Sequence, residues 1–312
     1  MRRTFALVFN DRAGVARPRL LDGVLAGLRA GGAAIFQVPT RSAEEASECV
    51  AALAAECGAD AVIAAGGDGT FRAVATGAAD SDLPIGFIPL GTGNVLAYEI
   101  GIRKRSAELA RGLLDNPVIP VQGGLVNGAP FFLMVGAGFD AEIVQGLNYR
   151  TKRMFGRAAY SGPVTKTLLR GPVPFDVNVD GRAFEASWVI ITRASHYGGS
   201  FVLTRETQLG TGGMVAVIIE GRTRAALLAA STALALGRLA KTETRPRGVT
   251  VIPATSVVIG QRVSTQIEVD GDEGGVSPVE IVTSGPTVRL IVPPRYVADV
   301  MDRHTNHVSY SK

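Results

Sequence analysis

The chain has 312 residues, of which 46% are hydrophobic and 19% are charged, an ordinary globular balance with ample apolar residues for a core. Its net charge of +4 favours anionic partners such as nucleotides or an acidic membrane surface. That charge is too small to indicate nucleic-acid binding, and the chain contains no nucleic-acid motif.

The chain contains no candidate transmembrane segment. The apolar run at its start is too short for a signal peptide and lacks a cleavage site. The longest apolar stretch, Ala225–Leu236, falls short of the ~18 residues that a membrane-spanning helix needs. We therefore expect a cytoplasmic protein that associates with membranes only peripherally and transiently. The sequence leaves the oligomeric state open, with a homodimer as one candidate.

Residues 1–122 alternate predicted strands and helices, which is typical of a doubly wound parallel sheet. Apolar residues at helical spacing predict the first helix, and a Ser42/Glu45 capping box predicts the start of the second. The predicted strands are Thr4–Asn10, Ala33–Pro39, Ala61–Ala65 and Ile85–Leu90, and the helices are Pro18–Arg29 and Ser42–Cys57.

The pattern changes after Asn116-Pro117. Short runs rich in β-forming residues, separated by Gly, Pro and Asn, predict an all-β sandwich. We therefore assign residues 1–122 to an α/β domain and 123–312 to a β-sandwich domain, with the C-terminal tail as a candidate for a return to the first domain. The runs include Phe131–Val135, Phe175–Val179, Ser187–Thr192, Val215–Ile219, Gln266–Val269 and Val288–Val292.

A glycine-rich loop, Gly66-Gly67-Asp68-Gly69-Thr70, follows the predicted buried strand Ala61–Ala65 and precedes a predicted helix. Its glycines allow a sharp turn and a close approach of a ligand to the backbone. The helix behind would direct free N–H groups at the loop, which suits a phosphate. Asp68 adds a carboxylate beside this site, which could hold a metal ion or accept a proton. A tight strand-to-helix turn without a ligand is the alternative.

A second loop, Gly91-Thr92-Gly93-Asn94, follows the predicted strand Ile85–Leu90. In an open parallel sheet, loops at the carboxyl ends of neighbouring strands converge on one crevice. Two successive glycine-rich loops at that edge indicate a site for a nucleotide.

The two loops at this interval, Gly-Gly-Asp-Gly-Thr and then Pro-Leu-Gly-Thr-Gly-Asn, resemble the diacylglycerol kinase catalytic domain family, which includes soluble bacterial lipid kinases and the sphingosine kinases. The resemblance runs from Thr4 to about Val297. It implies an N-terminal nucleotide-binding domain with a doubly wound parallel sheet and a C-terminal β-sandwich. The implied activity is ATP-dependent and Mg²⁺-dependent phosphorylation of a lipid hydroxyl at a membrane surface, on diacylglycerol or a sphingoid-like alcohol.

The same resemblance assigns the nucleotide contacts. In the family the first strand ends in Asn-Pro-x-Ser/Ala-Gly, and here Asp11 replaces the proline. Thr40 also matches a nucleotide-contacting position. Alternatively, it is only the neighbour of a helix N-cap and contacts no ligand. The implied ATP-binding residues are Asn10, Gly14, Thr40, Gly66, Gly67, Asp68, Gly69, Thr70, Gly91, Thr92, Gly93 and Asn94.

Two further acids, Asp270 and Asp272, follow the predicted strand Gln266–Val269. If the strand continues, both side chains point to the same face. The alternative is an Asp-Gly hairpin turn with solvated acids. The resemblance assigns Asp272 as the catalytic general base, and it assigns Asp68 and Asp270 as the catalytic, metal-linked acids.

Asp140, within Gly136–Ala141, matches the lipid side of the family's site and is the predicted substrate-binding residue. A helix N-cap is its alternative. The basic and aromatic cluster Tyr149–Arg157 would lie on anionic lipid head groups, or it is a solvated helix end. The segment Arg222–Lys241, apolar between basic ends, leaves the same two options open.

Several family acids are missing from this chain. Val95 and Gln122 occupy positions where many relatives carry acids, and Leu209–Gly213 replaces a segment that holds a structural magnesium in some members. A nucleotide-binding or lipid-binding protein that has lost phosphotransfer is therefore one alternative. An NAD kinase-like enzyme is another, because NAD kinases share the first loop. Their Thr-Gly-Ser-Thr-Ala-Tyr-like segment does not occur here.

Overall fold

The computed structural model describes residues 1–10, 18–56, 58–146 and 161–309 and divides the chain into two compact units. The first unit consists of Met1–Gln122, Leu209–Thr211 and Pro286–Lys312. The second consists of Gly123–Gln208 and Gly212–Gly285. The chain thus leaves the first unit after Gln122 and returns to it at Pro286, so the sandwich ends well before residue 312.

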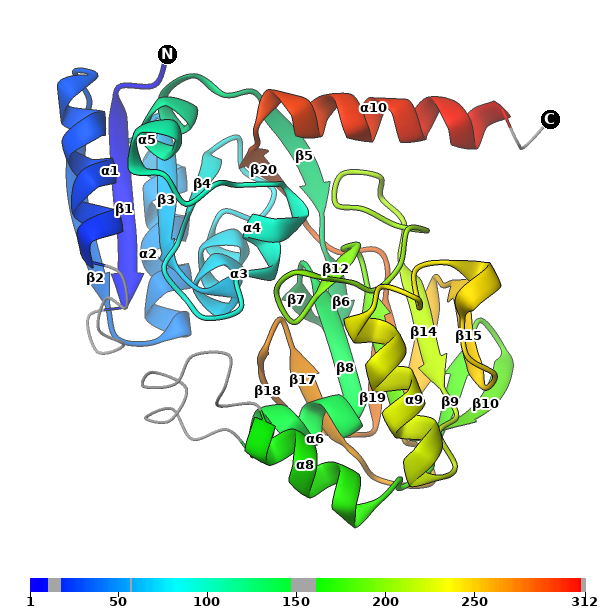
Figure 1. The fold of residues 1–312 in the computed structure, drawn as a ribbon. Coiled ribbons are helices and arrows are strands. Elements are labelled where there is room, and N and C mark those ends of the chain that lie inside the picture. Colours follow the sequence, from blue (N-terminus) through cyan, green and yellow to red (C-terminus); the bar gives the residue numbers. More distant parts are fainter. Residues whose placement is uncertain (11–17, 57, 147–160, 310–312) are drawn as a thin grey trace. The chain divides into compact units, whose positions relative to one another are not determined.

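A six-stranded sheet forms the centre of the first unit, in the order β2-β1-β3-β4-β20-β5 (Figure 1). The neighbouring pairs from β2 to β20 are parallel, and β5 runs antiparallel to β20. The strands are β1 (Thr4–Asn10), β2 (Ala34–Thr40), β3 (Ala61–Gly66), β4 (Pro84–Pro89), β5 (Val118–Gln122) and β20 (Thr287–Ile291). The predicted doubly wound sheet is confirmed. The assignment of the last strand to the sandwich was wrong, because β20 pairs with β4 and β5.

Helices pack on this sheet through their apolar faces. α1 and α5 pack against each other, and their leucines share one core with β1 and β3. α2 and α3 also pack against each other. The start of α2 carries the predicted cap, since Ser42 Oγ accepts from the Glu45 N–H at 3.1 Å. The helices are α1 (Pro18–Ala30), α2 (Ala43–Glu56), α3 (Asp68–Gly77), α4 (Val95–Glu99), α5 (Ser106–Asp115) and α10 (Pro294–Ser309).

The second unit contains two six-stranded antiparallel sheets whose inner faces share one apolar core, which confirms the predicted sandwich. One sheet has the order β10-β9-β16-β19-β6-β7 and the other β15-β14-β11-β8-β17-β18. The first sheet comprises β6 (Gly124–Val126), β7 (Ala129–Phe131), β9 (Phe175–Val179), β10 (Arg182–Ala186), β16 (Ser256–Ile259) and β19 (Val279–Val282). The second comprises β8 (Met134–Gly138), β11 (Trp188–Thr192), β14 (Val215–Ile219), β15 (Val249–Pro253), β17 (Gln266–Val269) and β18 (Asp272–Val276).

Among its described residues, the second unit also contains three α-helices, a 3-10 turn (Thr242–Thr244) and a short hairpin. The helices are α6 (Phe139–Gln145), α8 (Ser161–Arg170) and α9 (Arg224–Ala235), and the hairpin joins β12 (His196–Tyr197) to β13 (Phe201–Val202). Within the described part of the chain, no helix combines the length and the apolar character that crossing a bilayer requires.

A glycine sets the close approach of α3, which carries the first glycine-rich loop, to α2. A Cβ atom at Gly77 would lie 2.2 Å from the Ser47 carbonyl oxygen and 2.9 Å from Val50 Cβ. The first contact is with backbone, so a side chain at this position would push the two helices apart.

We predict that Gly77→Ala lowers the free energy of unfolding by about 1–3 kcal/mol, the usual cost of overpacking, measured as a lower urea midpoint. The matched control is Gly162→Ala in α8, where no atom lies within 4 Å of the added Cβ. That change removes a helical glycine and should leave stability unchanged or raise it by up to ~1 kcal/mol. Equal midpoints for the two variants would show that helix packing at Gly77 tolerates a methyl group.

Candidate functional site

The first glycine-rich loop joins the end of β3 to the start of α3. Gly67 is the N-cap of α3, and no side chain caps the helix there. The start of α3 is the positive end of the helix dipole, which suits an anionic ligand. Gly69 lies within the first turn of α3, so the loop owes its shape to the strand-to-helix turn and not to a left-handed residue at Gly69.

The Asp68 carboxylate ties the first loop to the second. Its Oδ2 accepts from the Val95 N–H at 2.9 Å, and its Oδ1 accepts from the Leu96 N–H at 3.1 Å. Val95 and Leu96 open α4, so the carboxylate occupies a helix N-terminus, where negative charge is stabilised. Sequence reasoning treated Asp68 as a ligand-facing acid and missed this bridge between the loops.

The two loops also touch backbone to backbone. The Gly66 carbonyl accepts from the amides of Leu90 and Gly91 at 2.8 and 3.1 Å. A Cβ atom at Gly91 would lie 2.7 Å from Gly67 Cα. A side chain at Gly91 would therefore separate the loops. The glycine is required here by close approach, because φ at Gly91 is not positive.

Asn94 closes the second loop in a left-handed conformation, with φ 51° and ψ 54°, which asparagine tolerates better than most residues. Its Nδ2 donates to the Gly91 carbonyl at 2.6 Å. Its Oδ1 is buried and accepts no hydrogen bond from the described residues. Because buried polar atoms are nearly always paired, this acceptor fits a ligand that brings an N–H or O–H donor, as a nucleotide does.

The other predicted nucleotide contacts have separate positions. Asn10 and Thr40 are register partners at the ends of β1 and β2, and the buried Thr40 hydroxyl donates to the Phe9 carbonyl at 3.3 Å. Thr40 thus joins the strand ends. A Cβ atom at Gly66 would lie 2.2 Å from Thr70 Oγ1, so Gly66 makes room for that side chain. Gly14 lies outside the described residues.

In the second unit, Asp270 and Gly271 form a two-residue turn between β17 and β18. Their φ angles are 51° and 85°, the pattern of a type I′ hairpin turn. Of the two options that the sequence left open, the Asp-Gly hairpin turn is the one observed, and the strand does not continue through Asp270. Since the chain reverses at Asp270, this residue and Asp272 do not alternate along one strand face.

The turn buries Asp270 and exposes Asp272. Asp270 is only 3% exposed. It accepts from the backbone amides of Leu133 and Met134 through Oδ1 and of Phe132 through Oδ2, at 2.8–2.9 Å. These bonds fasten the hairpin to the start of β8. The acid at Asp270 is therefore buried and hydrogen-bonded, and not solvated as the hairpin alternative supposed. Asp272 is exposed at the first position of β18.

Asp140 belongs to a buried cluster with Glu268 and Tyr197. The N-cap of α6 is Gly138, so the N-cap interpretation of Asp140 was wrong. Asp140 Oδ1 accepts from the Tyr197 hydroxyl. Its Oδ2 and Glu268 Oε1 are both buried, and a Cβ atom at Gly136 would lie 2.3 and 2.7 Å from them. Sequence reasoning missed Glu268 and Tyr197; a glutamate between Ile267 and Val269 was the available signal.

Those two carboxylate oxygens accept no hydrogen bond from the described residues unless one of the groups carries a proton. Burial raises the pKa of Asp140 to about 6. Burial, reinforced by the charge of Asp140, raises the pKa of Glu268 well above its ordinary value. Glu268 is therefore the group that holds the proton between them, while its Oε2 accepts from the Gly271 N–H at 2.8 Å.

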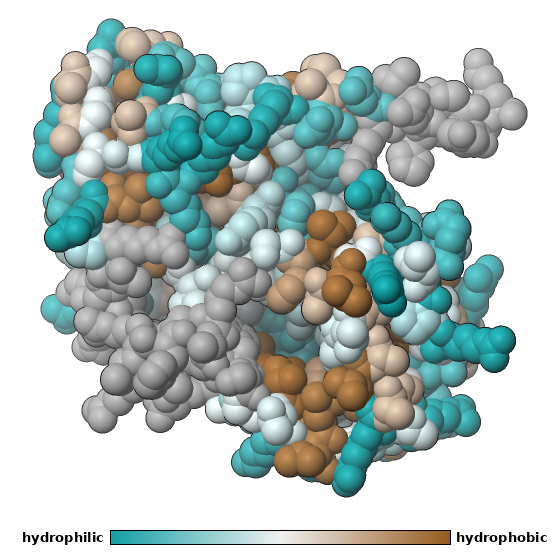
Figure 2. All heavy atoms as spheres, in the orientation of Figure 1, coloured by the Kyte–Doolittle hydropathy of each residue, from teal (hydrophilic) through white to brown (hydrophobic). Residues whose placement is uncertain are grey.

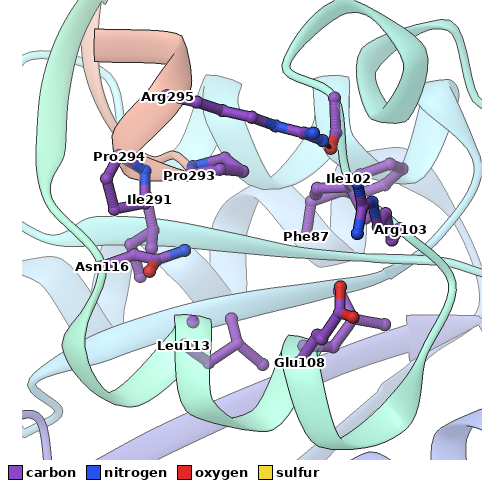
Figure 3. A pocket seen from close by; sticks show the side chains of 13 residues that line it. Phe87, Ile102, Arg103, Glu108, Leu113, Asn116, Ile291, Pro293, Pro294 and Arg295 are labelled. Carbon is purple, nitrogen blue, oxygen red and sulfur yellow. Dashed lines mark hydrogen bonds between the residues drawn. The ribbon is translucent and has the colours of Figure 1, made fainter. Parts of the chain in front are cut away.

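Residues of the first unit line a cavity of about 290 Å³ (Figure 3). Arg295 crosses one side of it toward Gly101, and Asn116 and Glu108 approach from α5 and its end. None of the predicted nucleotide-binding residues lines this cavity. The predicted lipid-facing cluster Tyr149–Arg157 lies outside the described residues.

Comparisons with known protein families cover almost the whole chain. The model for the diacylglycerol kinase catalytic domain matches residues 4–126. The model for the YegS C-terminal NAD kinase beta sandwich-like domain matches residues 133–292, about half of the chain. The two matches correspond to the α/β part and the sandwich part described above.

Individual relatives agree with these matches. The chain is 28% identical to the diacylglycerol kinase of Bacillus subtilis over 241 residues, 75% of this chain and 78% of that protein. It is 31% identical to the diacylglycerol kinase of Mycobacterium tuberculosis over 176 residues, 53% of this chain and 55% of that protein.

Among solved structures, a diacylglycerol kinase from Bacillus anthracis covers 94% of this chain and 98% of its own, with a TM-score of 0.66 at 17% identity, which shows a shared fold. Together with the paired glycine-rich loops and the sandwich, these matches show that the chain belongs to the diacylglycerol kinase family and is a kinase.

Proposed function

We propose that this kinase transfers the γ-phosphoryl group of ATP to the hydroxyl of a membrane lipid such as diacylglycerol or a sphingoid-like alcohol. The observation that carries the proposal is the joining of two glycine-rich loops by the Asp68 carboxylate at the start of α3, because a helix N-terminus suits a phosphate group. The family matches support a lipid as the acceptor.

No group of three or more His, Cys, Asp or Glu side chains suited to a metal ion occurs among the described residues. We therefore propose that Mg²⁺ arrives with the ATP phosphates, where it neutralises charge during transfer. Asp68 is the carboxylate that would contact it, and Asn94 Oδ1 would accept a donor from the nucleotide.

In the second unit, we propose that Asp272 accepts the proton of the lipid hydroxyl. Asp272 is exposed at the first position of β18. Asp270, which the resemblance places in the metal-linked network, is committed to three backbone amides, and we propose that it serves the reaction by fixing the turn that precedes Asp272. Asp140 is buried beside Glu268. We therefore propose that it positions the side chains around it for binding of the lipid head group, without contacting the lipid itself.

The direct test is radiolabelled ATP with a panel of lipid alcohols in mixed micelles, followed by chromatography of the products. A labelled phospholipid that requires Mg²⁺ supports the proposal. ATP binding without any labelled lipid would support the non-catalytic alternative, for which the missing acids at Val95 and Gln122 give a reason. Labelled NADP from added NAD would support the NAD kinase-like alternative.

We predict that Gly91→Ala weakens binding of an ATP analogue tenfold or more, because the new Cβ forces the two loops apart and displacements of about 1 Å at a site can cost ~10²-fold. Calorimetric titration measures the affinity. The control is Gly213→Ala, a loop glycine of the second unit whose added Cβ would meet only Thr207 Oγ1, at 3.6 Å. Unchanged affinity in a folded Gly91→Ala protein would remove this loop from the nucleotide site.

We predict that Asp272→Asn lowers kcat by ~10²–10⁴-fold, the usual contribution of a general base, while the affinity for ATP stays the same. Glu273→Gln is the matched control, because Glu273 is the next exposed acid of the same strand. Steady-state kinetics on the preferred lipid separates the two variants. If Glu273→Gln is the slow variant instead, the base is Glu273 and our assignment is wrong.

We predict that the second unit loses stability as pH rises from about 4 through about 6. The pKa of Asp140 is raised in the folded state, so the folded state binds this proton more tightly than the unfolded state does. The stability gained in this way disappears once Asp140 is ionised in both the folded and the unfolded state. Asp140→Asn keeps the size and the bond to Tyr197 and should reduce this pH dependence by up to about 3 kcal/mol, while the raised pKa of Glu268 leaves a remaining loss of stability with rising pH. Urea unfolding across this pH range measures it; identical profiles for both proteins would contradict the buried pair.

A further inference from the structure

Helix α9 presents an uncharged face to solvent. Its inner face packs into the second unit through Leu227, Ala230, Ala233 and Leu234. After Arg224, the exposed residues are alanine, leucine or threonine only. They are Ala225, Leu228, Ala229, Thr232, Ala235 and, just beyond the helix, Leu236. The side chains of Leu228 and Leu236 are 55% and 60% exposed. A surface helix ordinarily carries charged residues on this side.

The one polar group on that face is satisfied internally, because the Thr232 hydroxyl donates to the Leu228 carbonyl at 2.8 Å. The end of α8 extends the apolar surface. Leu169 is 66% exposed and Val173, just after the helix, 44% exposed. α8 packs against α9. We call this surface, from Leu169 to Leu236, the α8–α9 face; Figure 2 shows apolar residues gathered over both helices.

Basic residues lie on α8 and α9 and in the segments that flank α9 in the sequence. They are Lys166, Arg170, Arg222, Arg224, Arg238 and Lys241, all exposed. Glu142 lies 3.6 Å from Arg170, and Glu185 lies 3.4 Å from Arg222. Both pairs are solvent-exposed on the arginine side and therefore weak. An apolar strip with basic residues at its ends suits the surface of an anionic bilayer. The apolar side chains would enter the acyl-chain region, and the basic side chains would contact the negative head groups.

We propose that the α8–α9 face docks the protein onto an anionic lipid bilayer, with α9 lying in the plane of the interface. At 12 residues the helix is about 18 Å long, too short to span a bilayer but suited to lie within its surface. The inference rests on the proposed function, because a kinase whose acceptor is a bilayer lipid must bind the bilayer surface.

A second copy of the chain is a poorer occupant. In a two-fold symmetric contact along α9, the helices run either antiparallel or parallel. The antiparallel pair brings Arg222 and Arg224 against Arg238 and Lys241 of the other copy, and the parallel pair brings each of these residues against its own equivalent. Like charges would be brought together at low dielectric, whereas anionic lipids would neutralise the same residues.

The test is co-sedimentation of the full chain with phosphatidylcholine vesicles, with and without phosphatidylglycerol. Leu228→Glu combined with Leu236→Glu should lower binding to the anionic vesicles by about a hundredfold, since each leucine inserted contributes roughly tenfold or more. Arg238→Gln with Lys241→Gln should lower binding to anionic vesicles only and reduce its salt dependence. Met301→Glu, a 64% exposed apolar position on α10, is the matched control and should bind as the parent does.

Equal vesicle binding by the parent and the double Leu→Glu variant would overturn the proposal. A parent dimer that this variant converts to a monomer, without any change in vesicle binding, would assign the face to a second copy. The vesicle assay needs neither ATP nor turnover, so it fails independently of the kinase assay. Conversely, the double variant should keep its activity on a dispersed short-chain lipid alcohol and lose it on vesicles; a parallel loss on both would also contradict a docking role.

Discussion

The hydrogen bonds that the Val95 and Leu96 amides donate to the Asp68 carboxylate are the constraint on which the proposed site of the first unit depends. They turn two separate strand-to-helix connections into one structure. Because the loops already touch at Gly67 and Gly91, the carboxylate needs to span only the gap between adjacent strands β3 and β4. A charged acceptor at the start of α4 is also stabilised by that helix end.

Asp270 applies the same chemistry in the second unit, where its carboxylate binds three successive amides and so fixes the hairpin that presents Asp272. Glu268 adds a bond to the Gly271 amide from the same strand. Both units therefore use an acid to hold backbone in place beside the group proposed to act in the reaction.

Much of the fold was predictable because the spacing of apolar residues and the alternation of strands and helices can be recognised within short stretches of sequence. The alternation of strand and helix through residue 122 predicted the parallel sheet, and the short β-rich runs predicted the sandwich. The pairing of β20 with β4 was not predictable, since an apolar strand does not encode its distant partner. The loops were found through their glycines. The roles of Asp68 and Asp270 were incomplete because hydrogen bonds to backbone amides leave no mark in the sequence, and Glu268 was missed because nothing local pairs it with Asp140.

The most direct test of the central claim is amide hydrogen exchange at Val95 and Leu96, with and without a non-hydrolysable ATP analogue. If Asp68 holds the two loops together as a nucleotide cradle, both amides are protected in the free protein, and exchange slows further across Gly66–Thr70 and Gly91–Asn94 when the analogue binds. Nucleotide binding that leaves exchange in both loops unchanged would contradict the account and place the nucleotide elsewhere.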